Sequence, residues 1–233
     1  MRYAIPLALV SLFVASTGYA QQVRFGAKAG LNASTYQGAP VPNPGFRFGP
    51  VLGVLTRLSL GRHGSLQPEL LYEQRGATTD LLADGPNGVF NLPTIFSQQT
   101  RSRLHYLSLP MLARVEVGKL FAVAGPQVSY LVQAREQRTT LLDDPYTYNL
   151  AVPFTETRAG TEQYHRWELG GVVGVGYQVL ADLAVELRYA AAVTPLRHSP
   201  PALPADWVSW PARLEKARTT SLQAQVSYTF GSE

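Results

Sequence analysis

The chain has 233 residues, 15% of them charged, and a formal net charge of +4 at neutral pH. Because its 20 basic and 16 acidic residues are dispersed along the sequence, this small excess argues against a nucleic-acid-binding protein. The absence of cysteine excludes a small scaffold held by disulfides and any site built on thiolates.

The first 20 residues have the pattern of a secretory signal peptide. Arg2 supplies a short basic start, residues 5–15 an apolar stretch, and Gly18-Tyr19-Ala20 a cleavage site of the small-x-small type. A buried N-terminal helix is the alternative interpretation, and the proline within the apolar stretch disfavours it. We therefore expect residues 1–20 to be a signal peptide and residues 21–233 to form one domain.

Eight later segments alternate between apolar and polar residues, the pattern of strands with one apolar face. In chain order they cover residues 23–35, 46–60, 65–76, 103–117, 119–133, 166–179, 181–190 and 219–230. The fifth is almost wholly apolar, and Val128, Tyr130 and Val132 indicate that its even-numbered residues form the apolar face. No stretch after the signal approaches the roughly 20 consecutive apolar residues of a spanning helix, so any membrane crossing must use strands.

The connections between these segments alternate between short and long. Hairpin-length turns lie at residues 61–64, 118–119 and 180–182, whereas the other four connections are polar and about 10 to 30 residues long. With eight strands, all short turns then fall at one end of the sheet together with both chain termini. Outer-membrane barrels have this asymmetry. A soluble barrel such as a lipocalin can also alternate, but it directs its larger side chains inward.

These features predict an all-β fold: an eight-stranded, antiparallel, up-and-down transmembrane β-barrel with short periplasmic turns and long extracellular loops. The apolar face would meet lipid, and inward glycines would leave room inside for Arg57, Glu69, Arg114 and Arg188. Those glycines are Gly30, Gly49, Gly53, Gly170, Gly174 and Gly176. Because buried charges must be paired, we interpret the interior as an ion-pair network that fills the barrel, in preference to a selective pore or a proton-linked site.

Seven aromatic residues lie at or within the segments: Tyr36, Tyr72, Tyr106, Trp167, Tyr177, Tyr189 and Tyr228. Several of them could form the girdles that flank the apolar band of such a barrel. The last segment ends in Tyr228-Thr229-Phe230 and resembles the C-terminal signal by which outer-membrane assembly machinery recognises barrels. The match differs in one respect, since three residues follow Phe230.

The sequence predicts no catalytic, cofactor-binding or metal site. The four histidines, His63, His105, His165 and His198, lack any metal-ligand spacing. His105 and His165 could be combined with Asp143 and Asp144 into a catalytic constellation near the external rim, but we interpret them as rim residues that contact water or headgroups. The stretch GVVGVG lacks the Lys-Ser/Thr of a phosphate-binding loop and lies within a strand pattern.

Five stretches, taken in order, resemble the PorT-like outer-membrane β-barrel family of Bacteroidetes-type bacteria. They are FGAKAGLNAS (Phe25 to Ser34), SLQPELLYEQRG (Ser65 to Gly76), HYLSLPMLARV (His105 to Val115), FAVAGPQVSYLV (Phe121 to Val132) and the hairpin from ELGGVVGVGYQV to AVELRYA. The resemblance covers the mature chain apart from the long loops. It implies an outer-membrane barrel; most members of that family have no assigned activity, and one is linked to protein secretion.

We therefore expect an outer-membrane barrel without a catalytic role, structural or binding through its external loops, with a link to secretion or envelope function. Its expected partners are the lipid bilayer of the outer membrane and, through the C-terminal strand, the assembly machinery. We expect a monomer, with no nucleic acid and no cofactor. Two alternatives stay open: a soluble exported barrel that binds an apolar ligand, and a barrel-borne lipid hydrolase or acyltransferase.

Overall fold

The computed structural model describes residues 23–38, 43–84, 95–143, 153–197 and 217–230. Within these stretches the chain forms eleven β-strands and no helix that could span a membrane. In chain order the strands are β1 (Val23–Gln37), β2 (Pro44–Gly45), β3 (Arg47–Ser59), β4 (Gly64–Arg75), β5 (Thr78–Asp84), β6 (Ile95–Val117), β7 (Leu120–Asp143), β8 (Phe154–Ala159), β9 (Trp167–Gln178), β10 (Leu183–Ala192) and β11 (Arg218–Phe230). The expected signal peptide lies outside the described residues.

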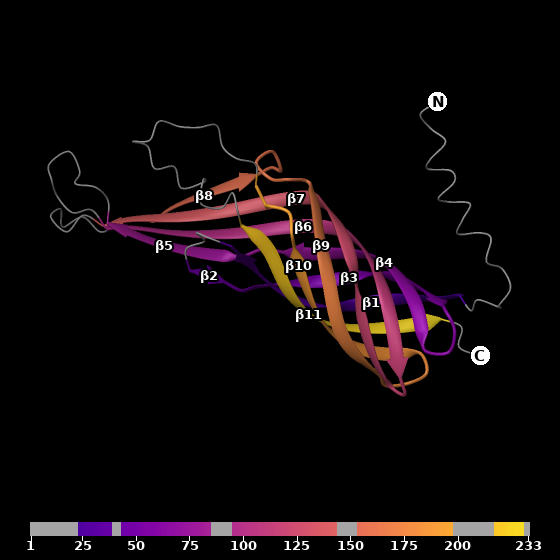
Figure 1. The fold of residues 1–233 in the computed structure, drawn as a ribbon. Coiled ribbons are helices and arrows are strands. Elements are labelled where there is room, and N and C mark those ends of the chain that lie inside the picture. Colours follow the sequence, from indigo (N-terminus) through magenta and orange to yellow (C-terminus); the bar gives the residue numbers. More distant parts are fainter. Residues whose placement is uncertain (1–22, 39–42, 85–94, 144–152, 198–216, 231–233) are drawn as a thin grey trace, which may run out of the picture.

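Eight of these strands close into a barrel (Figure 1). Around the ring the order is β1, β3, β4, β6, β7, β9, β10 and β11, and β11 pairs with β1 to complete the circle. All of these pairings are antiparallel. A closed ring leaves no strand edge unpaired, which is what a sheet needs where no water can satisfy its backbone groups. The predicted antiparallel ring of eight strands is confirmed.

The alternation places apolar side chains outside the ring and polar side chains inside it. Phe48, Leu187 and Val226 are 72, 48 and 46% exposed, whereas Glu69 and Arg188 are 2 and 1% exposed. A soluble barrel would bury the first set and expose the second. The predicted facing is therefore confirmed, and it is the facing of a barrel surrounded by lipid.

Strand β7, whose facing was ambiguous in the sequence, changes its inner face at one irregular step. His105 on β6 pairs with Gln133, but the next residue, Tyr106, pairs with Leu131, so Val132 is an extra residue on β7. Before this β-bulge, from Leu120 to Leu131, the even-numbered residues of β7 face outward, as predicted. After the β-bulge the even-numbered residues face inward instead, so Glu136 lies inside the barrel.

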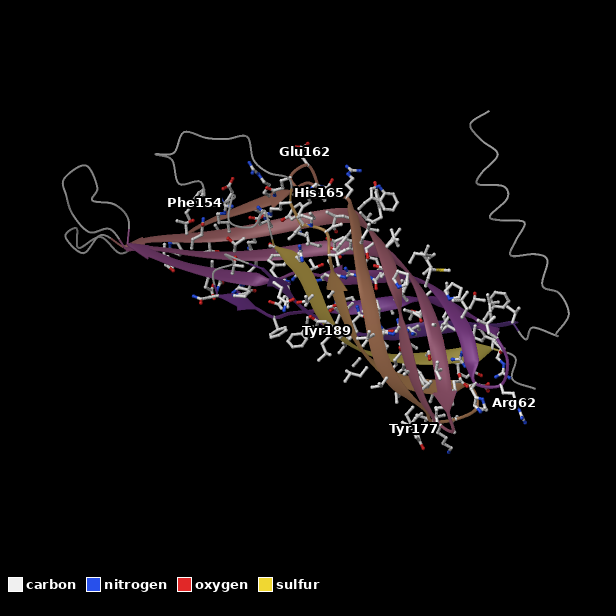
Figure 2. All side chains as sticks on the ribbon, in the orientation of Figure 1. Arg62, Phe154, Glu162, His165, Tyr177 and Tyr189 are labelled. Atoms are coloured by element: carbon white, nitrogen blue, oxygen red, sulfur yellow. The ribbon has the colours of Figure 1, made fainter. Side chains whose placement is uncertain are left out.

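All three tight turns lie at one end of the barrel, at residues 60–63, 118–119 and 179–182. Gly61 and Gly118 have φ angles of 104° and 63°, a left-handed conformation that a glycine adopts without steric cost. The start of β1 and the end of β11 lie at the same end, since Phe25 pairs with Phe230. Arg62 and Tyr177 mark this end in Figure 2, opposite Phe154.

The other end carries three strands that the sequence did not predict. Strands β6 and β7 are 23 and 24 residues long and continue beyond the ring, where β5 pairs with β6, β8 pairs with β7, and β2 pairs with β5 (Figure 1). We call this extension the external sheet. Segments expected to be loops are thus partly strands; stretches such as QQTRSR (Gln98 to Arg103) have no apolar face by which alternation could reveal them.

An apolar cluster fills the barrel beneath the external sheet. It consists of Tyr36, Ala77, Leu104, Tyr106, Leu131, Ala134, Tyr164, Leu196 and Ala217, all at most 2% exposed. Tyr36 and Tyr106 are therefore not among the aromatic residues that form a lipid-facing girdle, because both rings point inward. The other aromatic residues of the predicted girdles lie on the outer face: Tyr72, Trp167, Tyr177, Tyr189 and Tyr228.

Inward glycines leave room for large neighbours, as predicted. A Cβ atom on Gly174 would lie 2.8 Å from Cγ of Arg188, and one on Gly176 would lie 2.1 Å from Cζ of Phe121. The Phe121 ring in turn supports Arg114, whose guanidinium carbon lies 3.3 Å from the ring centroid. Small residues on β9 therefore make space for the long side chains that fill the lumen.

Candidate functional site

The middle of the lumen holds a cluster of two cations and two carboxylates, which we call the Glu69 cluster. Glu69 on β4 accepts hydrogen bonds from both terminal nitrogens of Arg188 on β10, at 2.7 and 2.6 Å, and from Lys28 on β1 at 2.8 Å. Glu186 accepts bonds from the same Lys28, at 3.0 Å, and from Arg188. All four side chains are at most 1% exposed, and their formal charges cancel.

A second cluster, the Glu73 cluster, lies nearer the external sheet. Arg75 bonds Glu73 on its own strand and Glu168 on β9, the latter at 2.5 Å. One cation thus faces two carboxylates, and neutral donors supply the remaining hydrogen bonds. Ser108 and Gln223 donate to Glu73 at 2.9 and 3.0 Å, while Thr219 and Tyr106 donate to Glu168 at 2.8 and 3.3 Å. Hydroxyl and amide donors of this kind allow a carboxylate to stay buried.

Basic residues gather inside the barrel at the turn end. Arg114 donates to Glu116 at 2.6 Å and to Gln178 at 3.2 Å, and Arg57 lies 3.9 Å from the same Glu116 carboxylate. The Glu116 side chain is 40% exposed, so this group meets water where the deeper clusters do not. Long side chains therefore occupy the lumen from the turn end to the external sheet.

The external end of the lumen is closed by an ion pair among aromatic rings. Arg197 lies 2.5 Å from Glu136, and Tyr164 donates to Glu136 at 3.0 Å while its ring lies beneath the Arg197 guanidinium. Burial alone would raise the pKa of Glu136, but Arg197, the Tyr164 hydrogen bond and Arg138 together lower that pKa below its usual value of 4.5. This carboxyl is therefore ionised at neutral pH and holds the external end shut. We call these residues the external ion pair.

A cavity of about 10 Å³ lies beside Arg75, Gln127 and Glu168, among the strands of the Glu73 cluster. A space of this size holds at most about one water molecule.

The histidines that the sequence offered for a catalytic constellation, His105 and His165, lie in different surroundings. His105 lies on the outer face of β6, where its Nδ1 and the Tyr72 hydroxyl are 2.6 Å apart. His165 lies in the segment between β8 and β9, and its backbone N–H donates to the carbonyl of Leu196 (Figure 2). His63 is exposed in a turn at the opposite end. The His198 and Asp144 positions and the Asp143 side chain lie outside the described residues, and the described residues contain no group of His, Asp or Glu that could hold a metal.

One feature that sequence reasoning missed is a groove at the external end lined by four arginines. A cavity of about 280 Å³ is bounded by Arg47, Arg101, Arg103 and Arg135, with Gln137 and Thr157 completing it. We call it the arginine groove. The spacing of Arg101 and Arg103 puts them on one face of a strand, but the contribution of Arg47 and Arg135 depends on how β3, β6 and β7 are placed. Only that spacing was visible in the sequence.

Residues 19–197 match a family model described as the outer membrane protein beta-barrel domain, which covers well over half of the chain. The chain belongs to this family. As a family member it is an outer-membrane protein whose surroundings are a lipid bilayer. The alternative of a soluble exported barrel is therefore set aside, in agreement with the apolar outer face.

Several solved structures resemble this outer-membrane barrel. Ail, the attachment invasion locus protein of Yersinia pestis, is 8% identical over 90% of this chain and 99% of that chain, with a TM-score of 0.42. Neisserial surface protein A is 13% identical over 88 and 97%, with a TM-score of 0.37, and CarO of Acinetobacter baumannii is 11% identical over 86 and 97%, with a TM-score of 0.35. These scores are low, and the family assignment does not rest on them. No curated protein sequence matches the chain.

Proposed function

We propose that this protein is a closed, non-catalytic outer-membrane barrel whose external sheet provides a binding surface. The observation that carries the proposal is the filling of the lumen. Three layers of paired charges and two apolar clusters lie across it, and the most deeply placed charges have their partners within the barrel. A pore needs a continuous path of water, which these side chains occupy.

Conductance in planar bilayers tests whether the barrel is closed. We expect the refolded wild-type protein to give no steady single-channel steps. A double variant, Glu69→Ala with Arg188→Ala, removes the side chains that cross the middle of the lumen and should introduce steps, provided that its heat-modifiable gel migration shows a folded barrel. Steady steps from the wild-type protein would overturn the proposal.

The non-catalytic part of the proposal is supported by the setting of His105. Its ring bonds a tyrosine on the lipid-facing side, and no hydroxyl nucleophile with a supporting carboxylate accompanies it among the described residues. The competing hypothesis is a lipid hydrolase or acyltransferase. Phospholipid or acyl-transfer turnover by the wild-type protein that is lost in His105→Ala or His165→Ala would establish that hypothesis and remove ours.

Finer assignments rest on sequence motifs. The order of LQPELLY, YLSLPML and AGPQVSYL supports membership in the PorT-like branch, and the Tyr-Thr-Phe ending of β11 supports recognition by the outer-membrane assembly machinery. We further propose a cleaved signal peptide over residues 1–20, a single barrel domain over residues 21–233, and a monomer. A role in secretion is supported only by the resemblance. Secretion that is unchanged in a strain lacking the protein would remove it.

A further inference from the structure

We propose that the arginine groove binds the phosphate groups of a phosphorylated glycolipid in the outer leaflet of the outer membrane. This names a ligand class for the binding role proposed above and rests on it. Three properties of the groove support this ligand class: its geometry, its uncompensated charge and its height above the apolar, lipid-facing residues of the barrel.

The geometry brings the arginines together from three ring strands. Arg103 on β6 pairs directly with Arg135 on β7, and the next position on the same face pairs Arg101 with Gln137. Thr157 on β8 pairs with Gln137 and extends this row. Arg47, the first residue of β3, borders the same cavity. Guanidinium, amide and hydroxyl donors thus converge on one space of about 280 Å³.

The charge in the groove is uncompensated within the described part of the chain. None of its four arginines forms an ion pair there, whereas Arg75, Arg188 and Arg197 inside the barrel each bind a carboxylate. Arg101 and Arg103 lie close enough to act on the charge of Arg47, whose Nε is buried and has no hydrogen-bond partner in the described structure.

Like charges directly across an antiparallel pair destabilise a sheet, so this arrangement works against folding in the absence of an anion. Asp80 on the neighbouring strand β5 accepts a hydrogen bond from Gln99 at 2.8 Å instead of pairing with an arginine. An external anion would remove the repulsion and supply the missing acceptors.

The position of the groove selects a lipid over a soluble anion. Below Arg103 the outer face of β6 continues with His105 and then the exposed apolar residues Leu107, Leu109 and Met111. Arg103 is four residues from Leu107, about 13 Å along the strand. The apolar run from Leu107 to Val117 is long enough for the roughly 25 Å band that such barrels present to lipid. Arg101, Arg103 and Arg135 therefore lie at the height of the headgroups, on the lipid-facing side and at the external end.

The chemistry of the donors fits phosphate. The planar guanidinium group donates two parallel hydrogen bonds to phosphate oxygens, and clustered arginines suit a ligand that carries more than one such group. A diphosphorylated glycolipid offers two phosphates at the level of the groove, while its acyl chains lie along the apolar face below.

The test compares three probes on the full-length protein refolded in neutral detergent. The probes are diphosphorylated lipid A in mixed micelles, the same lipid with both phosphates removed, and inorganic pyrophosphate. We expect the wild-type protein to bind the diphosphorylated lipid at least about tenfold more tightly than the other two probes, with an affinity that falls as salt rises. Arg101→Gln with Arg103→Gln should lose this preference. Arg62→Gln, in a turn at the opposite end, should keep it.

Three results would overturn this assignment. Equal binding of the lipid with and without phosphates, or full affinity in the double glutamine variant, would show that the groove does not recognise phosphate. Pyrophosphate that binds as tightly as the lipid would assign the groove to soluble anions. Heat-modifiable gel migration shows whether each variant is folded. Because the double variant leaves the lumen intact, it should give no conductance steps whatever the result of the binding test. Failure here is therefore distinct from failure of the closed-barrel proposal.

Discussion

Arg188 on β10 reaches across the lumen to Glu69 on β4 and binds both of its carboxylate oxygens, at 2.7 and 2.6 Å. Three ring strands separate the two in either direction around the wall: β3, β1 and β11 on one side, and β6, β7 and β9 on the other. Lys28, which lies on one of these intervening strands, binds the same carboxylate. The two sides of the barrel are thus joined through its centre as well as through its backbone ladder.

Truncation of Arg188 should destabilise the barrel strongly, because Glu69 and Glu186 would remain buried with only Lys28 to balance them. For Arg188→Ala we expect a loss of about 3–5 kcal/mol in the free energy of unfolding. Urea unfolding in lipid vesicles, followed by tryptophan fluorescence, measures this loss. Arg188→Lys keeps the positive charge but lacks the two parallel donors of the guanidinium group. Its free energy of unfolding should lie between those of the wild-type protein and Arg188→Ala. A midpoint unchanged in Arg188→Ala would show that the cluster adds nothing to stability.

A single methyl group on Gly176 should disturb the packing of the inner turn end. Its Cβ would lie 2.1 Å from the Phe121 ring, so Gly176→Ala should cost about 1–3 kcal/mol of unfolding free energy. Gly171→Ala on the same strand is the matched control, since the nearest atom to its Cβ is 3.9 Å away. Adding Phe121→Leu should restore part of the loss. Equal effects of the two glycine substitutions would contradict this account.

Charge on the lipid face should be costly in the membrane and harmless on the external sheet. Leu187 lies midway along β10 and is 48% exposed, so Leu187→Arg should cost about 2–4 kcal/mol of folding free energy in vesicles. Phe154 on β8 is equally apolar and 68% exposed, yet it lies beyond the ring. Phe154→Arg should leave folding unchanged, and a loss as large as that of Leu187→Arg would mean that the external sheet is also covered by lipid.

The external ion pair should make stability depend on pH at the acid end. The folded-state pKa of Glu136 is lower than the unfolded value near 4.5, so its contribution is complete above that pH and is lost as the pH falls toward the folded-state pKa. We expect protection of the backbone amide of Leu131, which donates to Arg166, to weaken below about pH 4.5 in hydrogen-exchange measurements. Glu136→Gln should remove that acid-dependent change. The same decline in both proteins would assign it to other carboxyls.

The alternation of apolar and polar residues sufficed to predict the ring, because lipid imposes one rule: every spanning strand directs apolar side chains outward and polar side chains inward. Phe48, Leu187 and Val226 obey it, and so do the buried charges opposite them. Residue type alone did not show which of the seven aromatic residues face lipid: Tyr36 and Tyr106 have the same parity as inward neighbours and lie inside the barrel. Parity was the better guide, since it follows from backbone geometry.

The external sheet and the arginine groove could not be predicted, because no such rule applies beyond the membrane. Strand pairing there depends on the continuation of β6 and β7, and the groove depends on the register of the β6–β7 hairpin, which brings Arg135 beside Arg103. The two arginines are 32 positions apart in the sequence, and the irregular step at Val132 sets which residues pair beyond it. Arg57, Glu69, Arg114 and Arg188 were predicted to lie inside the lumen, but their ion-pair partners were not, for the same reason.

The extra residue Val132 determines which of two neighbouring, oppositely charged side chains enters the molecule. With uninterrupted alternation along β7, Arg135 would point into the apolar cluster and Glu136 would point out opposite Arg101. The irregular step reverses this, so that the cation joins its like-charged neighbours outside and the anion reaches Arg197. The extra residue Val132 thus places Glu136 inside the barrel and Arg135 outside it. The charges inside are therefore paired, whereas the outer surface at the external end is electropositive.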